Sequence, residues 1–116
     1  EEDNTKVLQI VPETSKSKPL EIPAADFIFA ESDNNYVTVH FEDNGETRRE
    51  LIRLSIKRLA EQIAEAKEII RCHRSYLVNK NRIKDVEGNA RSLCVKLEGV
   101  EEGIPVSRSF PKAQLL

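Results

Sequence analysis

The stretch YVTVHFEDNGETRRELIRL (residues 36–54) decides the fold class of this chain. In its first half, Val37, Val39 and Phe41 alternate with more polar residues, which is the period of a strand with one buried face. The segment DNGE (43–46) contains Asn-Gly, the strongest short signal for a hairpin turn. Residues 47–54 can then return as the partner strand. The stretch therefore predicts an antiparallel β-hairpin.

Similar short apolar runs, separated by turn residues, lie on both sides of this hairpin. They predict eight to ten short strands, which makes the domain mainly β. The expected strands are residues 6–11, 20–23, 26–32, 36–42, 47–54, 68–73, 76–78, 82–87, 92–98 and 104–107.

A single principal helix is expected over residues 56–67, with Ser55 as its N-cap. One apolar stripe with helical spacing carries this prediction, and it consists of Ile56, Leu59, Ala60, Ile63 and Ala64. The opposite face of the helix carries both signs of charge. We therefore expect this helix to pack on the sheet and to expose a solvated outer face.

Length and composition indicate one soluble, folded domain. The chain has 116 residues, of which 39% are hydrophobic and 33% are charged, and no apolar run approaches the roughly 18–20 residues of a membrane span. It contains two cysteines and no methionine. We therefore expect reduced thiols in a cytoplasmic compartment, and a parent protein that could carry membrane or sensory parts.

The residue types that enzymes use are poorly arranged in this chain. Four scattered glycines form no phosphate-binding loop. Cys72 and His73 are adjacent in an expected strand, so they point to opposite faces and cannot act together as nucleophile and base. We expect no enzyme activity, no metal site and no cofactor. A redox role for Cys72 remains an alternative, because basic neighbours lower the pKa of a thiol.

Charge is distributed unevenly along the sequence. Residues 1–50 contain 12 acidic and 5 basic residues, whereas residues 51–116 contain 8 acidic and 13 basic residues. The segment RCHRSYLVNKNRIK (71–84) has five Lys or Arg residues and no Asp or Glu. Such asymmetry points to a polyanionic partner, with chance unevenness as the alternative.

Several side chains of this segment suit a nucleic acid. The Arg74 guanidinium matches the O6 and N7 edge of guanine or two phosphate oxygens. Short neutral donors that can position a protein on phosphates come from Ser75, Asn79 and Asn81. Point charge for phosphates comes from Lys80, Arg82 and Lys84. Alternatively, His73 and Asn79 shape a tight turn through local hydrogen bonds.

The same segment resembles the most distinctive motif of the LytTR family of DNA-binding domains. Two further parts of the chain, IPAADFIFAESDNNYVTVHF (22–41) and IPVSRSF (104–110), are similar to the opening and closing motifs of that family in the same order. The resemblance covers residues 19–116, and it leaves residues 1–18 as an N-terminal linker or an added strand. It implies an elongated stack of small antiparallel β-sheets with one principal helix.

This resemblance also implies a function and a set of contact residues. The domain would be the transcription-regulating output of a bacterial response regulator in a two-component system, and would present loops to successive major grooves of double-stranded DNA. By position, Asn35, Arg74 and Arg108 are the candidates for base contacts. Candidates for backbone contacts are Ser75, Lys80 and Lys112.

The resemblance further suggests paired repeats in the promoter, a homodimer on DNA and an upstream receiver or sensory module. A protein-interaction module without DNA binding is the alternative function. In that case the acidic residues 1–50 and the mixed-charge helix would form the contact surface.

Overall fold

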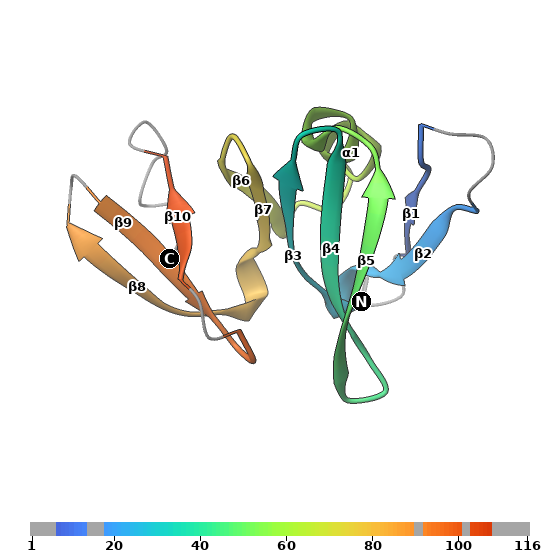
Figure 1. The fold of residues 1–116 in the computed structure, drawn as a ribbon. Coiled ribbons are helices and arrows are strands. Elements are labelled where there is room, and N and C mark those ends of the chain that lie inside the picture. The colour runs from blue at the N-terminus through green and yellow to red at the C-terminus, as the bar shows by residue number, and fades with distance from the viewer. Residues whose placement is uncertain (1–6, 14–17, 90–91, 101–102, 108–116) are drawn as a thin grey trace.

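The computed structural model describes residues 7–13, 18–89, 92–100 and 103–107, and within these the chain forms ten strands and one α-helix (Figure 1). The mainly β fold expected from the sequence is confirmed. The strands are β1 (Val7–Ile10), β2 (Leu20–Pro23), β3 (Phe27–Asp33), β4 (Tyr36–Asp43), β5 (Glu46–Arg53), β6 (Ile69–His73), β7 (Tyr76–Asn79), β8 (Ile83–Asn89), β9 (Ser92–Leu97) and β10 (Ile104–Val106). The helix is α1 (Ile56–Gln62), and two short 3-10 turns are η1 (Ala24–Asp26) and η2 (Lys80–Arg82).

These strands build three antiparallel sheets. The central sheet has the order β5-β4-β3-β7-β6, the N-terminal sheet is the hairpin β1-β2, and the C-terminal sheet has the order β10-β9-β8. The expected hairpin of β4 and β5 is present, with Asp43 opposite Glu46. Asn44 and Gly45 take the left-handed backbone conformation in its turn, with φ of 55° and 85°. Asn and Gly tolerate this conformation best, which explains their place in the turn.

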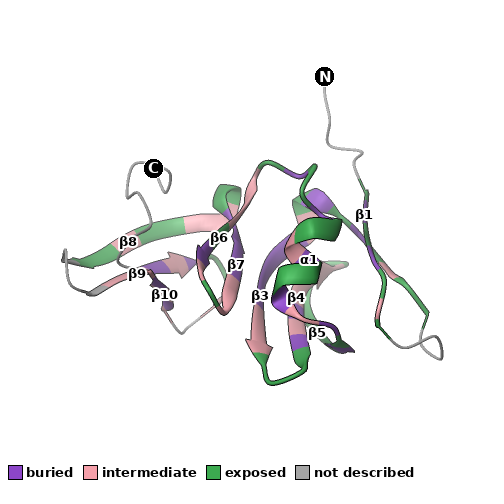
Figure 2. Cartoon of the chain, turned by 90° about the horizontal axis from the view of Figure 1, so that it is seen from above, coloured by how far each residue is buried: buried purple, intermediate pink, exposed green. Residues whose placement is uncertain are grey.

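Two hydrophobic cores lie on the two sides of the central sheet (Figures 1 and 2). The first joins the central sheet to α1 and to the β1–β2 hairpin, and it includes Val37 and Val39. The second joins the central sheet to the C-terminal sheet, and it includes Phe29 and Val78. Phe29 lies directly opposite Val78, and such paired residues project from the same face. The sheets therefore stack side by side, and the domain measures 43 × 35 × 25 Å along its principal axes.

The helix is shorter than the sequence predicts. It was expected over residues 56–67, but α1 ends at Gln62 and the chain continues in turns. Ser55 caps the helix as expected, since its hydroxyl accepts a hydrogen bond from the Arg58 N–H. Beyond the helix, Ile63 and Ala66 are buried and Ala64 is exposed, so the buried positions keep a helical spacing although the backbone is in turns. An apolar stripe cannot reveal where the helix ends, because apolar residues continue at helical spacing beyond Gln62.

His40 is held inside the stack. Its ring stacks on Phe29 with 4.0 Å between the ring centroids, and its Nε2 lies 2.9 Å from an oxygen of Glu31. Both neighbours lie on β3, opposite or diagonal to His40 on the same face. These contacts satisfy the histidine within the sheet.

No helix in the described parts of the chain has the length and apolar character needed to cross a bilayer.

Candidate nucleic-acid interface

One edge of the central sheet collects segments that are far apart in the sequence. The β3–β4 turn and the β6–β7 turn both lie at this edge, which is uppermost in Figure 1. They are joined by a backbone hydrogen bond from Ser32 N–H to the Ser75 carbonyl, at 2.9 Å. The end of β10 reaches the same edge, because Ser107 N–H donates to the Cys72 carbonyl at 2.7 Å. We call this the turn edge.

The strand order arranges these segments in a row along the turn edge. The end of β10 is followed by the β6–β7 turn, then the β3–β4 turn and finally the end of β5. Neighbouring strands lie about 4.8 Å apart, so the centres of the two turns are about 10 Å apart. The row therefore consists of two turns flanked by two strand ends on one side of the molecule.

In the β6–β7 turn, local hydrogen bonds hold the backbone. The Nδ1 atom of His73 accepts a hydrogen bond from Ser75 N–H at 3.1 Å. On the other side, an Nη2 hydrogen of Arg71 donates to the Arg74 carbonyl at 2.8 Å. The Arg74 side chain is exposed, and no carboxylate among the described residues forms an ion pair with its guanidinium. The turn thus presents an unpaired cation on an ordered backbone.

Asn35 is exposed in the β3–β4 turn. Its carbonyl accepts a hydrogen bond from Leu54 N–H at 3.1 Å, so the turn is anchored to the end of β5. Asn34 takes the left-handed conformation with φ of 59°, a role that Asn can fill without a glycine. The backbone bond and the left-handed Asn34 leave the Asn35 side chain on the outside of the turn edge.

Asn79 and Lys80 lie at the opposite end of β7 from Ser75. The Asn79 amide is buried and donates to the carbonyls of Ala24 and Phe27, while its Oδ1 accepts from the N–H of Asn81. Lys80 is exposed there. The structure therefore separates Lys80 from the turn edge by the length of a strand.

Arg82 is not a free charge. Its guanidinium donates twice to the Ala25 carbonyl, at 2.7 and 3.1 Å, and once to a carboxylate oxygen of Glu42, at 2.8 Å. The sequence suggested Arg82 as a point charge for phosphates, but in the fold Glu42 already offsets this charge. The reason is tertiary, because Glu42 and η1 reach Arg82 only when β3 and β4 pair.

The remaining predicted contacts lie beyond the described residues. Arg108 and Lys112 fall in the segment 108–116, which the structure does not describe. Ser107 is the last described residue before them. Its backbone bond to Cys72 brings the chain toward the β6–β7 turn at this point.

Cys72 is fully buried, and its thiol donates to the Pro105 carbonyl at 3.5 Å. Burial raises the pKa of this thiol to about 12. The basic neighbours were expected to lower it, but the adjacent Arg71 points to the other face of β6, Arg74 lies outside the strand, and the loss of solvation dominates. The thiol is therefore neutral near pH 7. No group of three His, Cys, Asp or Glu residues in the described ranges is placed to hold a metal ion.

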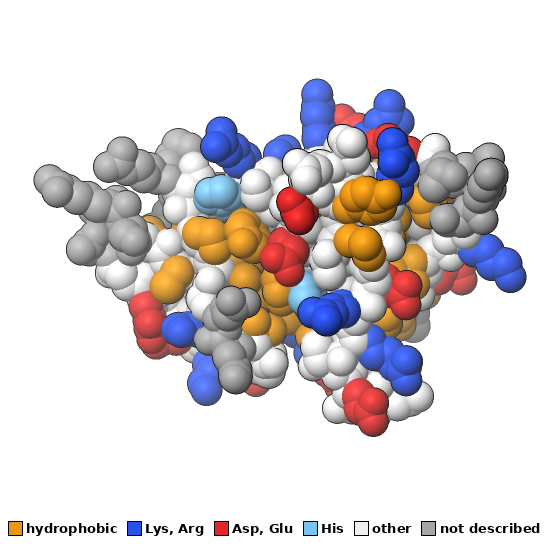
Figure 3. Space-filling model, in the orientation of Figure 1, with side chains coloured by type: hydrophobic (Ala, Val, Ile, Leu, Met, Phe, Trp, Pro, Cys, Tyr) orange, Lys and Arg blue, Asp and Glu red, His pale blue; other side chains and the backbone are white. Residues whose placement is uncertain are grey.

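Basic side chains project along the turn edge, with a few acidic ones among them (Figure 3). Besides Arg71 and Arg74, the end of β5 and the start of α1 contribute Arg53, Lys57 and Arg58. No pattern in the sequence marks these last three as DNA contacts. Only the antiparallel pairing of β4 with β5 brings them to the turn edge.

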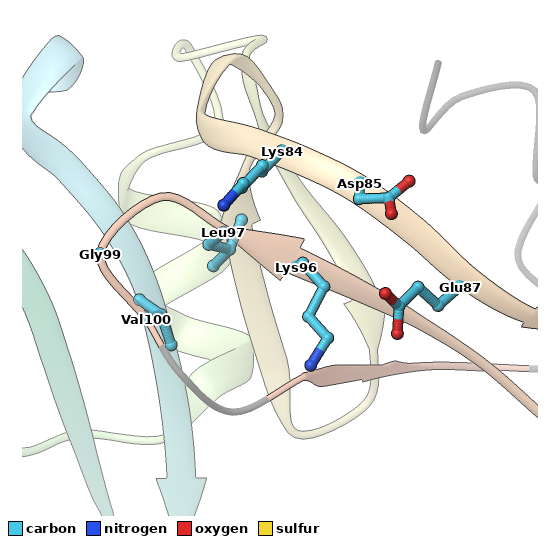
Figure 4. A pocket seen from close by; sticks show the side chains of 7 residues that line it. All are labelled: Lys84, Asp85, Glu87, Lys96, Leu97, Gly99 and Val100. Carbon is cyan, nitrogen blue, oxygen red and sulfur yellow. The ribbon is translucent and has the colours of Figure 1, made fainter.

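A separate open pocket of about 650 Å³ lies on the C-terminal sheet (Figure 4). Lys84, Asp85, Glu87 and Lys96 line it together with Leu97 and Val100. Two cations and two carboxylates balance each other there. This pocket therefore has no preference for a polyanion, in contrast to the turn edge.

Comparison with known proteins identifies the class of this domain. The family model described as the LytTr DNA-binding domain matches residues 17–114. The chain therefore belongs to the LytTr family of DNA-binding domains, which is not a family of enzymes. The match begins after β1, although Leu8 and Ile10 of β1 are buried in the first core.

The fold agrees with a solved structure of low sequence identity. That structure is the LytTr DNA-binding domain of a protein from Bacillus cereus described as a methyl-accepting/DNA response regulator. It superposes with a TM-score of 0.68 at 21% identity, over 94% of each chain. At this identity the likeness concerns the fold. No curated protein sequence matches the chain significantly.

Proposed function

We propose that this domain binds double-stranded DNA sequence-specifically through the turn edge, as the transcription-regulating output domain of a bacterial signalling protein. The observation that carries the proposal is the row of turns, in which the end of β10, the β6–β7 turn and the β3–β4 turn lie side by side. Turns rather than a recognition helix would enter the DNA, because α1 is packed into the first core by Ile56, Leu59 and the nearby Ile63.

The dimensions of the domain suit successive major grooves on one side of a duplex. Its long axis measures 43 Å, and one turn of B-DNA repeats after about 34–36 Å. The long axis of the whole domain therefore exceeds the distance from one major groove to the next on one side of the duplex.

Within this proposal each predicted residue has a role. Asn35 would read adenine, and Arg74 and Arg108 would read guanine, by the hydrogen-bonding patterns of these bases in the major groove. Ser75 and Lys112 would bind phosphates, while His73 and Asn79 would shape the backbone. Lys80 would contact a phosphate only on DNA that reaches the far end of β7.

The wider setting rests on the family resemblance. We propose a cytoplasmic domain, paired repeats in a promoter as its target, a homodimer on the DNA and an upstream receiver or sensory module. Selection of bound duplexes from a random pool would supply the site and the spacing of any repeats.

The test compares Arg74→Ala with wild type on a selected duplex and on a shuffled duplex of the same composition. Loss of one bidentate base contact should cost about 1–3 kcal/mol on the selected duplex and less on the shuffled one. Arg108→Ala should behave in the same way. Arg48→Ala is the matched control, because Arg48 is exposed at the other end of β5 and pairs with Asp43 at 3.0 Å.

Two outcomes would contradict the proposal. If Arg74→Ala and Arg108→Ala both discriminate between the two duplexes as well as wild type does, these arginines do not read bases. Absence of binding to any duplex at low salt would favour a protein-interaction module instead.

A further inference from the structure

We propose that the connection between β5 and α1 is a further DNA-contacting element, in which Arg53 and Lys57 bind phosphates. This inference rests on the proposed function and adds the β5–α1 connection to the DNA-contacting part of the turn edge. The contacts would lie at the rim of the groove that the β3–β4 turn enters. They would add affinity without reading sequence, because phosphates are the same at every base pair.

The β5–α1 connection lies beside the β3–β4 turn. Arg53 lies directly opposite Tyr36, the first residue of β4 after the β3–β4 turn. The next residue, Leu54, donates its N–H to the Asn35 carbonyl at 3.1 Å. The β5–α1 connection is therefore bonded to the turn that carries the proposed adenine contact, and it follows that turn in the row along the edge.

The distance from the β3–β4 turn to β5 is similar to the half-width of a major groove. The β3–β4 turn is centred between β3 and β4, so β5 lies one and a half strand spacings away, which is about 7 Å. The major groove of B-DNA is about 12 Å wide, so its phosphate rim lies about 6 Å from its centre. The end of β5 therefore lies about as far from the turn as the phosphate rim lies from the centre of the groove, which brings a phosphate within reach of the long Arg53 and Lys57 side chains.

The charges at this position are available for phosphates. The Arg53 guanidinium lies 5.8 Å from the centroid of the Tyr36 ring, a contact that orients the cation and leaves its charge intact. Lys57 is exposed on the first turn of α1, and no described residue forms an ion pair with it. Two cations therefore flank the β3–β4 turn on the side away from Arg74.

Nearby acidic residues limit the proposal to these two cations. Arg58 lies 3.6 Å from a carboxylate oxygen of Glu13, and the same oxygen accepts the N–H of Ser55. The charge of Arg58 is thus offset within the chain. Asp33, at the end of β3, is also exposed at the edge and would oppose phosphate binding. Arg53 and Lys57 are the cations of this connection without a carboxylate partner among the described residues.

The test measures how the affinity for DNA depends on salt. Each phosphate contact contributes about 0.9 to the slope of log affinity against log salt concentration. Wild type, Arg53→Ala and Lys57→Ala would be titrated with the selected and the shuffled duplex over a series of KCl concentrations. Lys67→Ala is the matched control, because Lys67 is exposed just before β6, at the end of that strand away from the turn edge.

Lys57→Ala and Arg53→Ala should each lower the slope by about 0.9 on both duplexes and leave their ratio of affinities unchanged. Lys67→Ala should keep the wild-type slope. A wild-type slope in Lys57→Ala and in Arg53→Ala would overturn the inference. Lys57→Glu serves as a second variant, and an unchanged affinity for both duplexes in it would also overturn the inference.

The same titrations separate this inference from the proposed function. Loss of discrimination in Arg74→Ala, together with unchanged slopes in the Lys57 and Arg53 variants, would leave the base contacts standing and remove only the further contacts. Reduced salt slopes in the Lys57 and Arg53 variants, together with wild-type discrimination in Arg74→Ala, would support the phosphate contacts and remove the base contact of Arg74.

Discussion

The guanidinium of Arg71 donates a hydrogen bond to the backbone carbonyl of Arg74, with 2.8 Å between the two atoms. From the other side of the turn, His73 accepts the N–H of Ser75. Two side chains therefore hold the backbone around the residue that we propose reads guanine. A contact of this kind reduces the conformational freedom that binding would otherwise have to remove.

We predict that Arg71→Ala weakens binding to the selected duplex about 2- to 12-fold, the equivalent of one net hydrogen bond of about 0.5–1.5 kcal/mol. Its discrimination against the shuffled duplex should fall as well, because the Arg74 backbone becomes less ordered. The salt slope provides the control. A slope lowered by about 0.9 with unchanged discrimination would show that Arg71 contacts a phosphate and does not position Arg74.

A second prediction concerns Asn79, whose side chain is 1% exposed. Asn79→Ala leaves the buried carbonyls of Ala24 and Phe27 without this donor. The Ala24 carbonyl keeps the N–H of Phe27 as a donor, and an unsatisfied buried polar group costs about 1–3 kcal/mol, so we expect a loss of about 1–3 kcal/mol in the free energy of unfolding. Urea denaturation measures this loss. Asn81→Ala, at an exposed site, should stay within about 0.5 kcal/mol of wild type, and an equal effect of both variants would contradict the prediction.

We expect Arg82 to contribute to the stability of the fold and not to the affinity for DNA. Its side chain is 18% exposed and binds the Ala25 carbonyl and Glu42. Arg82→Ala should lower the free energy of unfolding by about 1–3 kcal/mol, while the salt slope of DNA binding stays at the wild-type value. Lys84→Ala, at an exposed position two residues later, should leave stability nearly unchanged. A lowered slope with unchanged stability in Arg82→Ala would restore the phosphate role.

The buried thiol leads to a prediction on reactivity. In a Cys94→Ser variant, Cys72 should react slowly with a thiol-specific disulfide reagent at neutral pH, because its thiolate is scarce and its sulfur is fully buried. In a Cys72→Ala variant, the partly exposed Cys94 should react faster. Equal rates for the two thiols in folded protein would contradict this prediction.

The same pKa predicts how stability depends on pH. The pKa of Cys72 is raised in the folded protein from 9.0 to about 12, so folding favours the neutral thiol. The unfolded chain ionises first, and the contribution of the neutral thiol is therefore complete below pH 9 and decreases as the pH rises to about 12. Wild type should lose more free energy of unfolding over this range than Cys72→Ala does, as measured by denaturation at a series of pH values.

Much of the fold could be predicted from the sequence because its signals are local. Alternation and turn residues predicted ten strands within one or two residues of their observed ends, as β4 and its Asn-Gly turn illustrate. The end of α1 was not predictable in this way. Ala64 and Ala66 are equally apolar, and only packing against the sheet determines which of them is buried.

The candidate site also has features that the sequence determines and features that only the tertiary structure decides. By itself, the sequence determined the strands, the β4–β5 hairpin and a basic segment free of acids, since each depends on neighbouring residues. Only the tertiary structure decided which turns share an edge, that Arg82 binds Glu42, and that Arg53 and Lys57 stand beside the Asn35 turn. The physical reason is that strand pairing joins residues that are distant in sequence, and these contacts determine which cations remain free to meet DNA.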